Sequence, residues 1–296
     1  MLITVKTNSH ARRPFDDGRK QNQNPNNESI IMLTKVKTLA GYKLDSLDGE
    51  IGKVKEFYFD DRHWIIRYLV AETGTWLAHR QVLLSPYALA AVNDEAKNIA
   101  VELTKIQIEG SPSLDSHKPV SHQFEEAYYG YYGYPAYWGG PYSWGAYPDF
   151  MRDRDVRAVD AAHKKDDARV QRENGWDPHL RSTLSVSGHH IQALDGEIGH
   201  VVDFIIDDAT WAIRYLIIDT HNWWPGKKVL VAPEWIERVS WDERKVFINL
   251  NRETIKQSPE YTEESLVTRD YEIALHGHYH RKGYWLDELA AGGILL

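Results

Sequence analysis

The 296-residue chain contains no cysteine, which excludes disulfides, thiolate metal sites and a cysteine nucleophile. This absence fits the reducing cytoplasm, where we expect the protein to be located. The longest apolar runs, such as residues 215–218, are strand-sized and too short for an integral membrane segment. The sequence also lacks a P-loop, a dinucleotide-binding glycine pattern, a nucleophile elbow and a zincin histidine pair. We therefore expect neither an enzyme nor a cofactor.

Clustered positive charge is missing as well. The formal net charge is −8, from 35 Lys and Arg against 43 Asp and Glu. Nucleic-acid binding depends on clustered Lys and Arg, so we expect no nucleic-acid partner. Aromatic residues, in contrast, are plentiful: 11 Trp and 17 Tyr supply enough apolar area for real cores. A wholly disordered chain is therefore not expected.

An internal repeat organises the sequence. The motif L-D-G-E-I-G occupies residues 47–52 and recurs at 194–199, a shift of 194 − 47 = 147 positions. The motif I-R-Y-L at 66–69 recurs in the same register, which continues without a gap to Trp138 and its counterpart Trp285. A duplicated unit of this length predicts two similar domains.

The repeat divides the chain into five expected segments: a disordered leader (1–31), a first barrel (32–114), an aromatic and charged tail and linker (115–181), a second barrel (182–262) and a C-terminal tail with a short helix (263–296). We expect the two barrels to form an intrachain pseudo-dimer. A duplicated domain can reproduce, within one chain, the two-fold contact of a homodimer.

Short alternating or β-branched runs predict the strands of each copy. In the first copy they are 42–47, 51–59, 64–70, 81–84 and 98–103. Short helices are expected at Pro86 and over 104–109. The expected fold class is mainly β, with two small closed or partly open barrels of five to six strands each.

Glycines mark the first hairpin of each copy. Asp48-Gly49 is a residue pair favoured in tight hairpin turns. Gly52 and its copy Gly199 follow within the returning strand. A glycine inside a strand predicts a bulge or a close approach of another backbone.

Taken in order, the motif L-D-G-E-I-G, an acidic turn, W-x-I-R-Y-L, V-L-x-x-P and a closing helix ending in S-P resemble the PRC-barrel family. This family includes the cytoplasmic domain of the photosynthetic reaction-centre H subunit. The resemblance covers both copies, from about Thr34 to Tyr261. It implies a non-catalytic binding or assembly module that docks to other proteins. It leaves open an alternative, an accessory protein that supports proton or electron transfer and associates peripherally with a photosynthetic or respiratory membrane complex.

Acidic pairs recur at the turn after the long strand, as Asp60-Asp61 and Asp207-Asp208. They could bind a cation or relay protons. Short acidic side chains also bend and cap backbone, and we favour this role in turns because both copies keep the pairs.

Arg67 and Arg214 interrupt otherwise apolar strands. They could act as hooks for an anion or a carboxylate ligand. An Arg is rarely buried without a partner, and we favour a structural ion pair with a turn carboxylate such as Asp60 or Asp207.

Histidines 276, 278 and 280 form the run H-G-H-Y-H, which suggests weak metal binding. In a helix His276 and His280 would share a face. The first copy has Tyr or Gly at all three positions, so the scaffold does not require ligands there. We predict no metal site.

Ten aromatic residues lie among the twenty residues 128–147. The first half of this tract matches the second copy and could fold back over the barrel. The second half has no counterpart, and we regard Tyr142 and Trp144 as candidates for partner contact.

Overall fold

A computed structural model describes residues 33–112, 120, 122–134, 180–220, 227–262 and 266–286. The expected leader 1–31 lies outside the described residues. Tyr142, Trp144 and most of the linker 115–181 lie outside them too.

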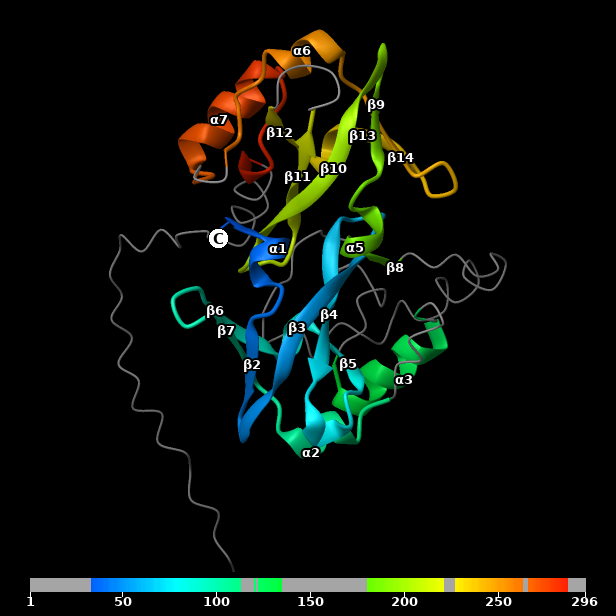
Figure 1. Ribbon diagram of the computed structural model, residues 1–296, viewed down its shortest axis with the longest axis vertical. Helices are drawn as coiled ribbons and strands as arrows, with labels where there is room; N and C mark the ends of the chain where they lie inside the picture. Colours follow the sequence, from blue (N-terminus) through cyan, green and yellow to red (C-terminus); the bar gives the residue numbers. More distant parts are fainter. Residues whose placement is uncertain are drawn as a thin grey trace, which may run out of the picture. The chain divides into compact units, whose positions relative to one another are not determined.

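The chain is mainly β, as expected, and forms two seven-stranded sheets (Figure 1). The main path of the first sheet has the order β5-β4-β3-β2-β7-β6. Its strands are β2 (Lys43–Ser46), β3 (Gly49–Asp60), β4 (Ile65–Thr73), β5 (Gln81–Leu84), β6 (Leu89–Asn93) and β7 (Asn98–Val101). The main path of the second sheet, β12-β11-β10-β9-β14-β13, repeats this order. Its strands are β9 (His190–Ala193), β10 (Gly196–Asp207), β11 (Ile213–Asp219), β12 (Lys228–Val231), β13 (Ile236–Ser240) and β14 (Lys245–Ile248).

Short helices follow the strands as the sequence predicts. A 3-10 helix opens at each proline, η2 (Pro86–Ala88) and η4 (Pro233–Trp235), and the expected closing helices are α2 (Lys105–Glu109) and α6 (Arg252–Lys256). Each repeat then adds a tail helix, α3 (His122–Tyr132) or α7 (Arg269–His278). The 3-10 helix η1 (Thr75–Leu77) lies between β4 and β5. Sequence patterns did not identify β6 and β13, because their alternation is weak.

The expected close approach of another strand's backbone is present at both hairpin glycines. Gly52 has φ +144° and Gly199 has φ +150°. A Cβ on Gly52 would overlap the carbonyl oxygen of Glu72, and one on Gly199 would overlap that of Asp219. The pairing register shifts beside both glycines, which is a bulge.

We expect Gly52→Ala to destabilise the protein by about 2 kcal/mol or more, because it adds a backbone clash to an unfavourable φ. Urea unfolding measures the loss. Gly130→Ala is the control, since a Cβ there meets nothing within 4 Å. An equal loss of stability in both variants would contradict this explanation.

The first strand and helix of each repeat lie on the sheet of the other repeat. Strand β1 (Leu33–Lys35) pairs with β10, and β8 (Leu180–Ser182) pairs with β3. The helices α1 (Val36–Leu39) and α5 (Thr183–Val186) follow these strands, so that α1 lies against the second repeat and α5 against the first (Figure 1). The exchange is reciprocal: Leu33 faces Asp207, and Leu180 faces Asp60.

The two repeats also meet directly at one backbone seam. The Ile66 N–H donates to the Trp211 carbonyl at 2.9 Å, and the Ile213 N–H donates to the Trp64 carbonyl at 2.7 Å. The two bonds join equivalent residues of the two repeats, since 64 + 147 = 211 and 66 + 147 = 213. Ile65 bridges its own equivalent, residue 212. The seam therefore lies on a local pseudo-two-fold axis.

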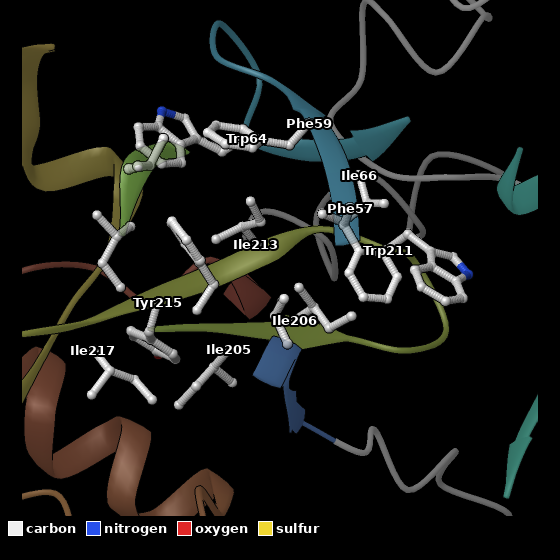
Figure 2. Close-up of a cluster of buried hydrophobic side chains, with 14 of the residues drawn as sticks. Phe57, Phe59, Trp64, Ile66, Ile205, Ile206, Trp211, Ile213, Tyr215 and Ile217 are labelled. Atoms are coloured by element: carbon white, nitrogen blue, oxygen red, sulfur yellow. The ribbon is translucent and has the colours of Figure 1, made fainter. Parts of the chain in front are cut away.

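One hydrophobic core runs through this seam. Its buried residues come from both repeats. The ring centroids of Phe57 and Trp211 are 6.1 Å apart, and those of Phe59 and Trp64 are 5.2 Å apart (Figure 2). The ring centroid of Phe59 also lies 5.9 Å from that of Phe204. Each fully buried aromatic side chain contributes roughly 1.5–3 kcal/mol of hydrophobic stabilisation. The seam thus joins the repeats by packing as well as by hydrogen bonds.

Candidate functional site

The two strand arginines are buried and paired. The Arg67 side chain is fully buried, and its Nη2 lies 2.9 Å from Oδ2 of Asp60. Arg214 Nη2 lies 2.9 Å from Oδ2 of Asp207. These carboxylates are the partners named for them from the sequence. Each pair links a turn to the adjacent central strand, so the arginine and the carboxylate bind each other within the fold.

Asp60 is a hydrogen-bonding centre of its turn. It accepts from the Arg62 N–H at 2.9 Å and contacts His63 Nδ1 at 2.7 Å. Burial alone would raise the pKa of Asp60, but the hydrogen bond from His63 and the charge of Arg67 hold it well below its ordinary value of 3.8. A depressed carboxyl pKa stabilises the folded state above that ordinary value, and this contribution is lost as the pH falls. Asp60 therefore has a structural role in its turn.

Its neighbour Asp61 lies at the exchanged strand. The carboxylate forms an ion pair of 2.9 Å with Arg181 of β8. The equivalent residue in the second repeat, Asp208, is half-buried. The four acidic turn residues thus lie near the contacts between repeats. Within the described residues, no three His, Asp or Glu side chains come together as a metal site.

A small cavity of about 210 Å³ lies where α1 meets the second sheet, and Lys37, Asp203 and Lys228 are among its lining residues. Asp203 accepts hydrogen bonds from the backbone N–H groups of Lys37 and Phe204. Burial raises the pKa of Asp203 to about 6. In the first repeat Glu56 takes its place and accepts from the Ser182 hydroxyl. Both acidic side chains therefore hold the exchanged segment.

Each tail helix is anchored to its sheet by a tyrosine and a glutamate. Tyr68 on β4 donates to Glu125 on α3 at 3.0 Å. At the same shift of 147, Tyr215 on β11 donates to Glu272 on α7 at 2.9 Å. All four side chains are buried. The sequence matched these residues between copies without assigning them a role; the available signal was an acidic residue kept in both tails.

The three histidines do not form a common site. His276 is buried, with its ring centroid 5.1 Å from that of Trp235 and 5.0 Å from that of Trp285. His278 lies 2.7 Å from the carbonyl of Thr254. Helix α7 ends at His278, so His280, at φ +51°, does not share a helical face with His276.

An open groove of about 650 Å³ lies beside the end of α7. Its lining combines apolar and neutral polar residues: Leu194, Asn249, Leu250, Asn251, Thr254, Gln257, Gly277, His278, Tyr279 and His280. None of them is Lys, Arg, Asp or Glu. Leu194, in the hairpin turn, is 58% exposed. An exposed leucine beside the amide side chains of Asn249 and Asn251 suits contact with an uncharged polar segment.

The equivalent region of the first repeat carries a tyrosine in place of a histidine. Tyr131 stands at the position of His278, and its hydroxyl donates to the carbonyl of Gln107 at 2.9 Å. That hydroxyl also lies 2.6 Å from where a Cβ on Gly110 would be. The second repeat has the shorter His278 instead of the tyrosine. The two copies share a fold but differ in this surface, a difference that the sequence did not reveal as a site.

None of the helices in the described ranges has the length and apolarity of a membrane span. No protein-family model matches the chain, and no curated protein matches it at a significant level.

Proposed function

We propose that this chain is a non-catalytic binding or assembly module of the PRC-barrel type, which docks to other proteins. Each sheet supplies six strands in one repeated order, and we propose that each forms a small barrel of that type. The resemblance rests on the ordered motifs of both copies.

The observation that carries the docking function is the groove beside α7. It is open and lined by no Lys, Arg, Asp or Glu, and the larger Tyr131 replaces His278 at the equivalent position of the first repeat. The strand arginines and turn carboxylates are, in contrast, engaged inside the fold. We therefore propose that the groove takes an uncharged polar segment of a partner protein. Amide and imidazole groups would bind its backbone, and Leu194 would contact an apolar side chain.

His278→Tyr tests this function, because it places the larger tyrosine of the first repeat in the lining of the groove. A photo-crosslinking residue at position 254, expressed in the native host, first identifies the partner by mass spectrometry. Binding of that purified partner is then measured by calorimetry. We expect His278→Tyr to weaken it by tenfold or more, which is about 1.4 kcal/mol.

Tyr131→His is the matched control and should leave the affinity unchanged. Equal affinities of the wild type and His278→Tyr would refute docking at this groove. Crosslinking at position 107, the equivalent of position 254 in the first repeat, should not capture the same protein. If it does, the groove of the second repeat is not the specific site.

A further inference from the structure

A buried hydrogen-bond chain fastens α7 to the second sheet. Its four contacts are His276 Nδ1 to the Lys282 carbonyl at 3.0 Å, His276 Nε2 to the Tyr215 hydroxyl at 3.0 Å, that hydroxyl to Glu272 Oε1 at 2.9 Å, and the Tyr284 hydroxyl to the same Oε1 at 2.8 Å. We call these side chains the Glu272 network. It joins β11, α7 and the segment after α7.

When His276 is neutral and Glu272 is ionised, the network has one hydrogen fewer than its four contacts require. Each contact requires one hydrogen between two heavy atoms. A neutral His276 brings one, and the hydroxyls of Tyr215 and Tyr284 bring one each. An ionised Glu272 brings none. Three hydrogens therefore serve four contacts, and one pair of acceptors must face each other unless a further proton is bound.

We propose that the Glu272 network holds one exchangeable proton, and that loss of this proton loosens α7 and the segment 283–286 from the second sheet. With the proton on Glu272, its O–H donates to Tyr215, whose hydroxyl then donates to His276. With the proton on His276, both ring nitrogens donate, and Tyr215 donates to Glu272. Either arrangement satisfies all four contacts. This inference goes beyond the proposed function and does not depend on it.

Burial and the surrounding charges influence whether the proton lies on Glu272 or on His276. Burial raises the pKa of Glu272 above its ordinary 4.5, although the hydrogen bond from Tyr284 and the charge of Arg269 oppose this. Burial also lowers the pKa of His276 below its ordinary 6.5. The charged groups facing the network are Arg269, 2.8 Å from Glu272, and Arg214 on β11. Burial therefore shifts the proton toward Glu272 and away from His276.

The raised pKa of Glu272 sets the direction in which stability changes with pH. The contribution of this proton to stability is fully present below the ordinary pKa of 4.5 and is lost as the pH rises through the raised value. The segment that loosens includes Tyr284, which lies with its ring 4.0 Å from the Arg214 guanidinium. It also includes Trp285, which packs on His276.

Among the described residues, the first repeat differs from the second at the position of His276. Its glutamate, Glu125, accepts from Tyr68 in the same way, but Tyr129 stands in the place of His276. A tyrosine carries its own hydroxyl hydrogen and keeps it near neutral pH. Burial raises the pKa of Tyr129 further. Helix α3 is therefore an internal control in every experiment.

Hydrogen–deuterium exchange of the full chain tests the proposal, with labelling times scaled to the intrinsic exchange rate at each pH. In the wild type we expect protection of residues 269–286 to fall about tenfold as the pH rises from about 4.5 to about 8, which corresponds to the loss of about one buried hydrogen bond. Protection of residues 122–134 should stay constant. Equal responses of α7 and α3 would overturn the proposal.

Two variants separate the network from general pH effects. His276→Tyr places the residue of the first repeat in the second, so the four-contact chain no longer needs a shared proton. Glu272→Gln supplies an amide hydrogen at every pH. Each should abolish the tenfold fall, whatever its effect on overall stability. A wild-type pH response in Glu272→Gln would overturn the proposal even if His276→Tyr failed to fold.

Discussion

Asp60→Ala is expected to destabilise the protein by about 3–5 kcal/mol, because it leaves the guanidinium of Arg67 buried without its carboxylate. The Arg67 side chain has no solvent exposure, and that of Asp60 is 3% exposed. A buried cation that loses its counter-ion bears its full desolvation cost. Urea unfolding followed by tryptophan fluorescence measures the change in the free energy of unfolding.

The double variant Asp60→Ala/Arg67→Leu separates the cost of an unpaired charge from the worth of the pair. Replacing a whole buried ion pair by apolar groups is often neutral. We therefore expect the double variant to regain most of the stability lost by Asp60→Ala. A double variant as unstable as the single variant would show that the pair itself, or the turn that it holds, supplies the stability. Asp207→Ala should have a similar effect in the second repeat, where Arg214 is 7% exposed.

The second large effect concerns the exchanged strands. A protease site placed within residues 150–170 allows the linker to be cut in the folded protein. We expect the two halves to remain together through size-exclusion chromatography at micromolar concentration, because β1 and β8 each belong to the sheet of the other half. The shared core at the seam adds to this association.

Charges in the exchanged helices should release the halves. Val36 on α1 is 6% exposed and Val186 on α5 is fully buried. The double variant Val36→Asp/Val186→Asp buries two unpaired carboxylates, which costs several kcal/mol. We expect its halves to separate after cleavage. Leu184→Asp is the control on α5, since Leu184 is 56% exposed, and its halves should stay together. Separation of the wild-type halves would contradict the exchange.

The reciprocal exchange of β1 and β8 fits a protein made of two copies of one domain. The seam bonds between Ile66 and Trp211 and between Ile213 and Trp64 are equivalent. A two-fold contact of this kind is the normal geometry of a homodimer. Fusion of two copies in one chain makes the contact independent of concentration and lets the copies diverge. The copies differ in sequence at His278, beside the groove, and at His276, in the Glu272 network.

Local sequence determined much of each repeat. Alternating residues, the Asp48-Gly49 turn and the proline at position 86 are short-range signals, and the elements that they predict are present. Gly52 could be linked to a close backbone approach, because only glycine tolerates that φ without strain. The partners of Arg67 and Arg214 could also be named, since a buried guanidinium requires a carboxylate and each repeat places one seven positions earlier.

Tertiary structure alone decided the rest. Similar repeats carry no clear signal for which copy receives β1, because each sheet offers Leu33–Lys35 an equivalent strand. The burial of Glu272 and His276 depends on how α7 packs, and therefore so does the sharing of a proton. The groove brings His278 together with Gln257, and in the first repeat Tyr131 lies against Gly110, although these partners are far apart in the sequence. Short-range preferences fix strands and turns, while exchange, proton sharing and the groove arise from contacts between residues far apart in the sequence.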